Sequence, residues 1–284
     1  MKITEVEQFV VAVPHIEPIQ KHRPQDYTDR PISIIKVHTD EGIYGLGESG
    51  RGGRFDDAIE KWIGLDPMTL KWQDLGGGFG SAIFDIVGKA LGIPAHKLMG
   101  AQHWEEVPVG YWSCPMEPEE FAAEAEKGVK LGFKTHKLKA RPWNIVETVR
   151  LMTEAAGPDY GIIVDPNFTF ETPEESIRLA HELEKYNIEA FEDPFSYEEY
   201  GWDSYRQFRQ QTNIPLAPHL YDPKKILEAI KADAADMFNT GGGPSHASNN
   251  AGIAEAAGMP VWLQVTGLGL GVSGAFATHV HAVI

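Results

Sequence analysis

Cysteine is almost missing from this chain, because Cys114 is the only one among 284 residues. A single cysteine cannot form an intrachain disulfide, and such a composition suits a reducing compartment, so we expect the cytoplasm. Long apolar runs are missing as well. No stretch reaches the roughly 18 apolar residues of a transmembrane helix, and the N-terminus lacks the apolar core of a signal peptide. We therefore expect no contact with a membrane.

Positive charge is also scarce. Lys and Arg together number 25 against 41 Asp and Glu, which gives a net charge of −16. The field of such a surface repels nucleic acid and anionic lipid, so neither is an expected partner. A small anionic substrate remains compatible, because it responds to the local charge of a pocket. Hydrophobic residues make up 42% of the chain, which is ordinary for a globular protein with a sizeable core.

The first hundred residues have the pattern of a small α+β domain. Residues 1–13 read as a strand, and residues 33–39 and 43–48 predict a β-hairpin around Asp40-Glu41-Gly42. Residues 14–31 hold four prolines and many charges, so we expect a loop there. Helices are predicted at 56–62 and 81–91, with Gly76-Gly77-Gly78 as a turn before the second helix. We assign residues 1–104 to this domain.

From Val107 onward a strand and a helix alternate. Strands are predicted at 107–113, 133–139, 161–165, 188–192, 214–217, 236–240 and 260–265, each followed by a helical segment. Seven βα units in series predict a parallel sheet, and this many repeats favour closure into a TIM-type (β/α) barrel. We assign residues 105–284 to the barrel. No eighth strand is visible before Ile284, so the expected barrel lacks its last strand.

Polar residues end several of these strands. Residues 133–139 end on Lys137 and Lys139, and the next strands end on Asp165, Glu192 and His219. Asp165 and Glu192 are 27 residues apart, as are Glu192 and His219. Because the active site of a βα barrel lies at the carboxyl ends of its strands, we expect these five side chains to converge.

Asp165 and Glu192 are hard oxygen donors of the kind that Mg²⁺ prefers. The alternative is that each acid only caps the following helix. Lys137 and Lys139 lie two apart on a strand, so both point to one face. On an inward face the two ammonium groups need neighbouring anions. Their mutual repulsion should depress the pKa of one lysine, which makes that lysine a candidate general base. A solvated edge with outward lysines is the alternative.

His219 leaves three possibilities open. A neutral imidazole can ligate Mn²⁺, Zn²⁺ or Fe²⁺ more readily than Mg²⁺, it can act as an acid or base, or it can be a structural polar residue. His246 also faces the expected mouth, although histidines in such loops are usually incidental. The run Gly241-Gly242-Gly243 can cradle an anion or form a tight turn. Asn239 and Gln264 end the sixth and seventh strands, and neither can act as a base.

These features resemble the mandelate racemase/muconate lactonizing enzyme family of the enolase superfamily. The resemblance rests on Lys137-x-Lys139, Asp165-x-Asn167, Phe191-Glu192-Asp193-Pro194 and residues 214–217, and on residues 41–48 and 82–100 in the N-terminal domain. It covers essentially the whole chain. It implies that the N-terminal domain caps the barrel mouth, and that the protein assembles into a homo-oligomer.

The resemblance also implies removal of the proton α to a carboxylate, giving an enediolate held by a divalent metal, usually Mg²⁺, with Mn²⁺ or another ion as alternatives. Lys139 would be the base and Lys137 would neutralise the substrate carboxylate. Asp165, Glu192 and His219 would be the metal ligands. The remaining residues would contact a small anionic substrate, such as an acid sugar: Asn167, His22, Arg23, Arg51 and His246.

Three departures from the family pattern shape the functional hypotheses. His219 stands where the family has Asp or Glu, and Gln264 and Asn239 stand where its members often place a second base. The expected activity is therefore that of a lyase, a dehydratase needing one base. The alternatives are an isomerase (a racemase, epimerase or cycloisomerase) and an enolase-like scaffold without catalysis.

Overall fold

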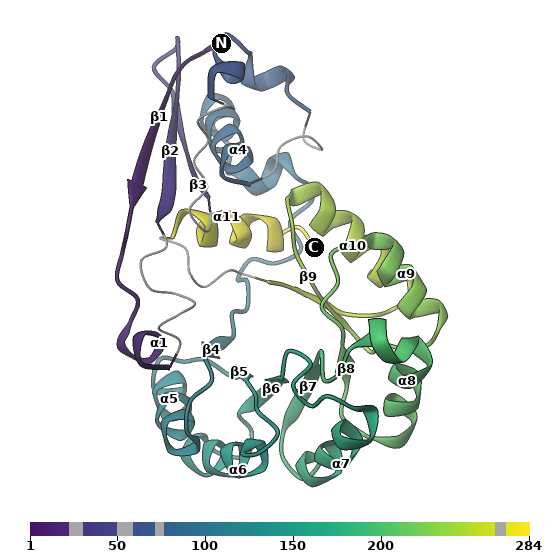
Figure 1. Cartoon of the computed structure of the whole chain (residues 1–284). Coiled ribbons are helices and arrows are strands. Elements are labelled where there is room, and N and C mark those ends of the chain that lie inside the picture. Colours follow the sequence, from purple (N-terminus) through teal and green to yellow (C-terminus); the bar gives the residue numbers. More distant parts are fainter. Residues whose placement is uncertain (23–30, 50–58, 72–76, 265–270) are drawn as a thin grey trace.

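The computed structural model describes residues 1–22, 31–49, 59–71, 77–264 and 271–284. Figure 1 shows two parts, a small sheet with one long helix at the N-terminal end of the chain and a larger curved array of strands and helices. The larger part is an α/β barrel of the TIM type, and the smaller part is the predicted α+β domain. The boundary between residues 104 and 105 stays a prediction.

The N-terminal sheet is antiparallel and has the order β1-β2-β3. Its strands are β1 (Ile3–Val11), β2 (Ile32–Thr39) and β3 (Tyr44–Ser49). The predicted hairpin is confirmed, because β2 and β3 pair in antiparallel register around a turn at Gly42, whose φ of 77° suits glycine. Residues of β2 alternate in burial, as expected for a strand with one face on a core.

One face of this sheet packs against α4 (Gly77–Leu91). The helix begins four residues earlier than predicted, because Gly77 and Gly78 belong to its first turn. A Cβ atom at Gly47 would lie 1.7 Å from the carbonyl oxygen of Gly78, and a Cβ at Gly45 would lie 2.0 Å from that of Ala82. The glycines of β3 therefore let the helix backbone approach the strand closely. Short 3-10 helices flank it: η1 (Glu60–Trp62), η2 (Pro67–Thr69) and η4 (Ala95–Leu98).

In the part of the chain that the structure describes, seven parallel strands and their helices form the barrel part, as the alternating pattern predicted. The strands are β4 (Tyr111–Ser113), β5 (Thr135–Lys139), β6 (Gly161–Asp165), β7 (Ile188–Glu192), β8 (Leu216–Ala217), β9 (Phe238–Thr240) and β10 (Val261–Leu263). The helices between them are α5 (Pro118–Lys130), α6 (Ile145–Ala156), α7 (Pro173–Leu183), α8 (Tyr197–Gln211), α9 (Pro223–Lys231) and α10 (Pro244–Ala256).

Hydrogen bonds join these strands in sequence order. Strands β4 to β8 form one sheet, β9 pairs with β10, and a bridge between His219 and Asn239 connects the two groups. Within the described residues, β4 and β10 are not paired with each other. The core lies between the strands and the ring of helices, where aromatic residues such as Phe191, Phe208 and Tyr205 are fully buried.

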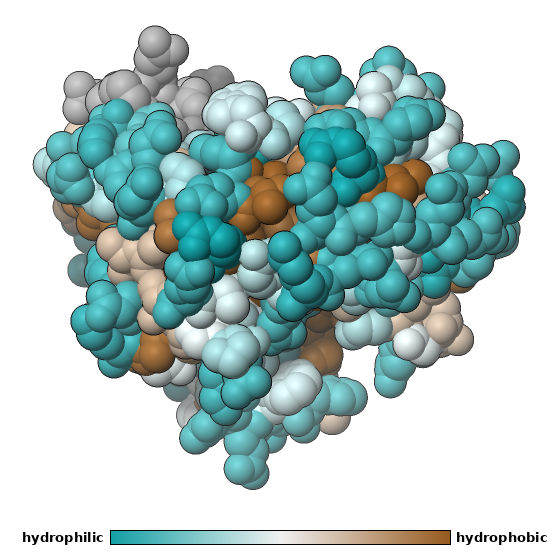
Figure 2. Space-filling view, turned by 90° about the horizontal axis from the view of Figure 1, so that it is seen from below, coloured by the Kyte–Doolittle hydropathy of each residue, from teal (hydrophilic) through white to brown (hydrophobic). Residues whose placement is uncertain are grey.

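The outer faces of the helices are hydrophilic. Arg150 on α6 pairs with Glu147 and Glu154, and Arg178 on α7 makes equivalent pairs with Glu175 and Glu182, about one turn away on either side. Figure 2 shows the molecule from below relative to Figure 1. In this view polar side chains cover most of the surface, and apolar side chains gather in short bands between them. No helix of the described residues is both long enough and apolar enough to cross a membrane.

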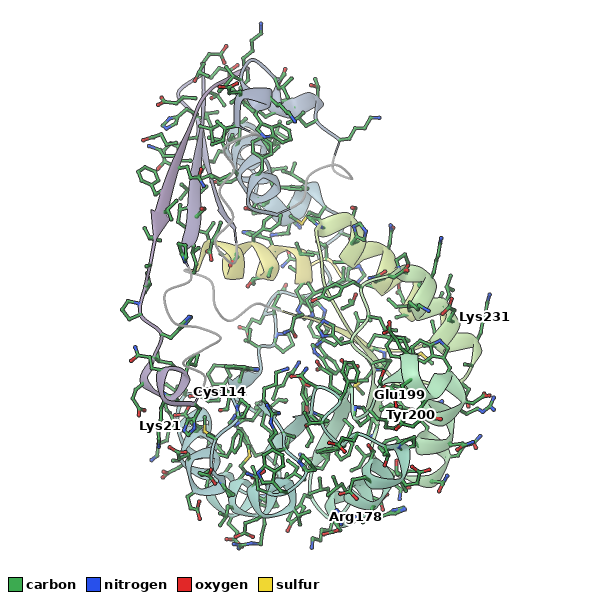
Figure 3. All side chains as sticks on the ribbon, viewed as in Figure 1. Lys21, Cys114, Arg178, Glu199, Tyr200 and Lys231 are labelled. Carbon is green, nitrogen blue, oxygen red and sulfur yellow. The ribbon has the colours of Figure 1, made fainter. Side chains whose placement is uncertain are left out.

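The prediction of a loop across residues 14–31 is wrong for its first part, where α1 (Glu17–His22) forms. Ile19 is buried in the barrel core, and the Sγ of Cys114 contacts the carbonyl oxygen of Pro18 at 3.6 Å. Figure 3 shows Lys21 on α1 close to Cys114, just after β4. A single apolar residue, too little for a periodic pattern, anchors this short helix to the barrel.

The C-terminal helix α11 (Val272–His281) forms where a helix was predicted, yet it does more than cover the last strand. It contacts β3, α4 and η4 as well as β10, and it lies between the two parts in Figure 1. The buried carboxylate of Glu48 accepts a hydrogen bond of 3.1 Å from the N–H of Ser273 in the first turn of α11. Carboxylates are favoured at helix N-termini, so this bond ties the C-terminal helix to the N-terminal sheet.

Candidate active site at the strand ends

The carboxyl ends of β5, β6 and β7 bring four charged side chains together. Lys139 is in register with Asp165 across the parallel pair of β5 and β6. On the opposite face of β5, Leu138 is fully buried in the core between strands and helices. The two lysines therefore share the inward face, as the strand period predicted.

Lys137 bridges two carboxylates. Its Nζ lies 2.6 Å from both Oε atoms of Glu192 and 3.0 Å from Oδ2 of Asp165. Both acids are fully buried, and the lysine side chain is only 11% exposed. Charges removed from water in this way are tolerated only when they are paired and hydrogen-bonded.

Lys139 donates a hydrogen bond to the same oxygen of Asp165. The other oxygen, Oδ1, accepts from the backbone N–H of Asn167 at 3.1 Å. Asp165 is thus held by two ammonium groups and one backbone donor. Asn167 contributes through its backbone here, whereas a contact of its side chain with a substrate stays a prediction.

Neighbouring charges, as well as burial, set the pKa values of Asp165 and Lys137. Burial alone would raise the pKa of Asp165, but the ammonium groups of Lys137 and Lys139 outweigh burial and hold the pKa below its usual range. Burial also favours the neutral amine of Lys137, yet Asp165 and Glu192 raise its pKa above the usual value. A depressed lysine pKa was expected from mutual repulsion of the lysines, and at Lys137 this expectation is wrong because two carboxylates surround the amine.

A second cluster adjoins the first, and it contains a residue that sequence reasoning missed. Donor atoms of Glu192, Asp193 and His219 all lie within 4.8 Å of one another. The N–H of His219 donates to Oδ1 of Asp193 at 3.0 Å, and Nδ1 of His219 lies 3.7 Å from Oε1 of Glu192. The signal for Asp193 was present, since it directly follows Glu192 at the end of a buried strand.

The predicted ligand set consists of Asp165, Glu192 and His219. The cluster in the structure contains Asp193 in place of Asp165. Asp165 lies on the other side of Glu192, engaged by the two lysines. Which of these carboxylates holds a metal stays a prediction. The strand ends therefore carry two adjoining clusters, which share Glu192.

Burial shifts the pKa values of all three residues of this cluster. It raises the pKa of Glu192 to about 8, with a further increase from Asp165 and opposition from Lys137. It raises the pKa of Asp193 to about 7, against the N–H donated by His219. It lowers the pKa of His219 to about 4, and the charge of Lys137 adds to this effect. Acids that resist ionisation beside a neutral imidazole indicate a site with a deficit of positive charge.

Three residues at the ends of β6 and β7 have a strained backbone conformation. Asn167, Phe168 and Asp193 have φ values of 49°, 66° and 48°, in the left-handed region. Asparagine and aspartate tolerate this region, but a bulky aromatic residue does not, and each such residue costs about 1–3 kcal/mol. Strain of this kind concentrates at functional sites.

Asn239 and Gln264 complete the polar network. Asn239 Nδ2 donates to Oε1 of Glu192 at 2.9 Å and to Oε1 of Gln264 at 3.0 Å, and Lys137 reaches the same oxygen of Gln264 at 3.4 Å. Both amides therefore orient charged groups of the cluster. Neither can remove a proton.

The residues predicted to contact the substrate lie in different surroundings. His22 has a carboxylate partner, because its Nε2 lies 2.9 Å from Glu120, which also accepts from Lys21. His246 is exposed on the first turn of α10. Arg23 and Arg51 lie outside the described residues. Their contacts with a substrate stay predictions.

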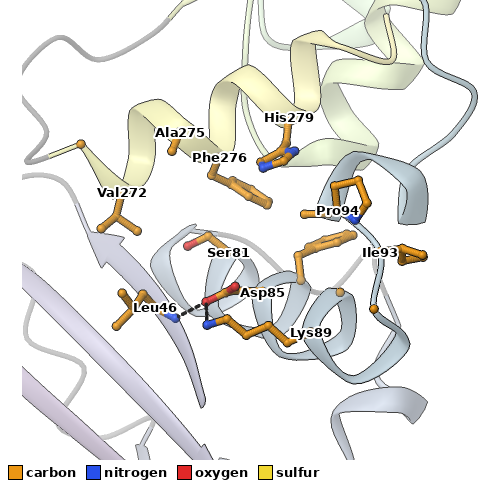
Figure 4. A pocket seen from close by; sticks show the side chains of 15 residues that line it. Leu46, Ser81, Asp85, Lys89, Ile93, Pro94, Val272, Ala275, Phe276 and His279 are labelled. Carbon is orange, nitrogen blue, oxygen red and sulfur yellow. Dashed lines mark hydrogen bonds and ion pairs between the residues drawn. The ribbon is translucent and has the colours of Figure 1, made fainter. Parts of the chain in front are cut away.

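A large cavity among the described residues lies elsewhere. It has a volume of about 660 Å³ and opens between α4, η4 and α11, lined by apolar residues such as Phe84 and Phe276 and by Asp85, Lys89 and His279 (Figure 4). None of its lining residues belongs to the strand-end clusters. Convergent charge, not cavity size, singles out the candidate active site.

Comparison with known proteins agrees with this geometry. A family model described as enolase C-terminal domain-like matches residues 120–284, more than half of the chain. An N-succinyl-L-Arg/Lys racemase of Bacillus cereus is 29% identical over 273 residues, which cover 84% of this chain and 72% of that protein. An arabinonate dehydratase of Saccharolobus solfataricus is 26% identical over 273 residues, with coverage of 82% and 72%.

A solved structure extends the similarity to three dimensions. The dipeptide epimerase of Cytophaga hutchinsonii, in complex with Mg and the dipeptide D-Ala-L-Val, superposes with a TM-score of 0.84 at 26% identity. The match covers 100% of this chain and 84% of that one. The family model, the relatives and the superposition agree on one assignment: the chain belongs to the enolase superfamily, within its mandelate racemase/muconate lactonizing enzyme family.

Proposed function

We propose that this protein removes the proton α to the carboxylate of a small anionic substrate, with Lys139 as the base. One observation carries the proposal: two inward lysines meet two buried carboxylates at the ends of adjacent strands. The side chain of Lys139 is 12% exposed, and its amine is held by Asp165 at the carboxyl end of the neighbouring strand. A substrate carboxylate that approached Lys137 would find an ammonium whose charged form is favoured.

We further propose that a divalent cation belongs to the site. The residues fit one, because Glu192, Asp193 and His219 supply two carboxylates and an imidazole, and Nε2 of His219 is buried with no partner among the described residues. When bound, such an ion would supply electrophilic stabilisation of the negative charge that develops on the substrate carboxylate. Mg²⁺ is the ion implied by the family, and the imidazole nitrogen favours Mn²⁺ as an alternative.

Among the possible reactions we favour dehydration. In its neutral amine form Lys139 takes the α-proton, and the electron pair of the broken C–H bond then forms a C=C bond as the β-hydroxyl departs. The protonated Lys139 can return that proton to the hydroxyl, so water leaves and the step balances with one base. Asn239 and Gln264 at the following strand ends offer no second base. An acid sugar or a related hydroxy-carboxylate would be the substrate.

An isomerase is the second candidate, favoured by the relatives. Both the Bacillus cereus racemase and the Cytophaga hutchinsonii epimerase match most of this chain. Inversion at the α-carbon would need a proton donor on the opposite face, and His219 is the residue of the cluster that would have to provide it. We also propose action in the cytoplasm and assembly as a homo-oligomer, on composition and family resemblance alone.

The deciding experiment follows hydroxy-carboxylates and N-acyl amino acids by NMR in deuterated water with Mg²⁺ or Mn²⁺. Exchange of the α-proton tests the shared first step, and appearance of a 2-oxo acid identifies dehydration. We expect Lys139→Ala to lower the exchange rate by at least a thousandfold. Lys231→Ala, which changes an exposed lysine on α9, should leave it unaltered.

Full activity of Lys139→Ala would overturn the assignment of the base. Exchange with inversion and no loss of water would replace the dehydratase by the isomerase. A folded protein that binds neither ion and exchanges no substrate would be an enolase-like scaffold.

A further inference from the structure

We propose that three aromatic residues, Trp143, Phe168 and Tyr221, bind the part of the substrate that lies beyond its carboxylate, and that this part is flat and apolar rather than a chain of hydroxyl groups. We call these three residues the aromatic rim. The inference rests on the proposed function for the carboxylate end. It narrows the substrate proposed there, an acid sugar or a related hydroxy-carboxylate, to a hydroxy-carboxylate that carries an aryl or acyl group.

The aromatic rim follows the strand ends of the candidate active site. Trp143 comes four residues after Lys139, Phe168 three after Asp165, and Tyr221 two after His219. The carboxyl ends of parallel strands share one edge, so the loops that leave them lie on the same face of the barrel. The three residues of the aromatic rim therefore lie on three different loops at the face of the barrel that carries the mouth.

All three side chains are exposed, in contrast to the aromatic residues of the barrel core. Trp143 is 77% exposed, Tyr221 48% and Phe168 41%, whereas the large aromatic residues of the barrel core are fully buried. Single exposed apolar residues need no explanation, but three on the loops that carry the charged cluster form a pattern. Aromatic side chains supply large contact surfaces with few torsions to immobilise on binding.

Phe168 has a strained backbone conformation. It follows Asn167, and both residues have left-handed backbone, with φ values of 66° and 49°. The conformation is locked, because the N–H of Phe168 donates to the carbonyl of Asp193 at 2.8 Å and its carbonyl accepts from Glu171 at 3.0 Å. Glycine or asparagine would adopt this turn more easily. A phenylalanine here indicates that the ring itself is useful.

Tyr221 is fixed against the cluster. Its ring centroid lies 4.8 Å from that of His219, and its carbonyl accepts a bond of 2.9 Å from Asn250. A Cβ atom at Gly241 would lie 2.8 Å from Cε1 of Tyr221, so the glycine leaves room for the ring. One ring thus adjoins a candidate metal ligand, and it can meet the atoms of a substrate next to its carboxylate.

The expected cations of the mouth do not offset this apolar character within the described residues. Lys21 and His22 on α1 both lie within ion-pair distance of the carboxylate of Glu120, so each of them has an acidic partner outside the strand-end clusters. A polyhydroxylated chain needs many hydrogen-bond partners, which aromatic faces do not provide. An aryl or acyl group loses little hydration on the same surface.

The test compares two hydroxy-carboxylates that share the reacting end, 3-phenylglycerate and D-gluconate. Binding to the full chain is measured by calorimetry with Mg²⁺ or Mn²⁺, and α-proton exchange is recorded in parallel. We expect phenylglycerate to bind at least tenfold more tightly. Phe168→Leu should keep most of this preference, and Phe168→Gly should reduce it at least fivefold without lowering the melting temperature, because glycine relieves the backbone strain.

Glu171→Gly is the matched control, since Glu171 has a φ of 63° in the same loop but carries no ring. It should leave the preference unchanged. Equal or tighter binding of gluconate, or an unchanged preference in Phe168→Gly, would overturn the inference. A preference that follows these variants without any α-proton exchange would support the aromatic rim and count against the proposed reaction alone.

Discussion

The backbone N–H of His219 donates a hydrogen bond of 3.0 Å to Oδ1 of Asp193. This bond joins the loop after β7 to the end of β8, and it brings an imidazole beside two buried carboxylates. Burial holds the pKa of His219 at about 4, so the ring is neutral at pH 7 and its nitrogens are available as ligands. The position of His219 therefore bears directly on which ion the site prefers.

We predict that the chelator-treated protein binds Mn²⁺ more tightly than Mg²⁺, because an imidazole donor suits Mn²⁺ better. Binding can be followed by calorimetry and by the rise in stability, which reaches about 2.7 kcal/mol at an ion concentration of 100 times Kd. His219→Asp should shift the preference toward Mg²⁺, and Asp193→Asn should weaken both ions. The control is Asp233→Asn, an exposed residue paired with Arg209. Identical affinities in His219→Asp and the unaltered protein would remove His219 from the ligand set.

Stability should depend on pH through His136. This residue of β5 is fully buried, with Nε2 2.8 Å from Oγ of Ser113, and burial lowers its pKa to about 3 from 6.5. Between these values the unfolded chain binds a proton that the folded chain does not, so stability is lost as the pH falls below about 6.5. Through His136 alone, the free energy of unfolding should be lower by about 2 kcal/mol at pH 5 than at pH 8.

Urea unfolding of the unaltered protein and of His136→Gln at pH 8, 6 and 5 measures this contribution as the difference between their pH slopes. His181→Gln serves as the control, because His181 is 52% exposed on α7. Its slope should match that of the unaltered protein. If His136→Gln showed the same slope too, the buried ring would not be the titrating group.

Close packing of β3 on α4 should make Gly47 intolerant of a side chain. The added methyl group in Gly47→Ala would meet the carbonyl oxygen of Gly78 at 1.7 Å, so strand and helix must separate. We expect a loss of about 3 kcal/mol in the free energy of unfolding. Gly252→Ala on α10 meets no atom within 4 Å and should gain up to about 1 kcal/mol. Equal stabilities of the two variants in urea would contradict the packing argument.

Strand-end chemistry was readable from the sequence because it depends on local periods. Two lysines spaced by two must share a face of a strand, and an acid after a buried apolar run must lie at its end. The inward side of β5 and the ends of β6 and β7 followed from these rules alone, and the structure has them at Lys139, Asp165 and Glu192. Seven repeats of a strand and a helix were likewise sufficient to predict the barrel.

Contacts between distant segments were not readable in this way. The pairing of His22 with Glu120 and the docking of α11 through Glu48 join residues about 100 and 225 positions apart, and no local period encodes them. From the sequence, Asp193 was named only as part of the motif Phe191-Glu192-Asp193-Pro194, and only the position of His219 after the next strand brings it into the cluster. The sequence by itself determined which residues end the strands. The tertiary structure decided which of them meet, because burial and charge compensation depend on neighbours that the chain brings together only when it folds.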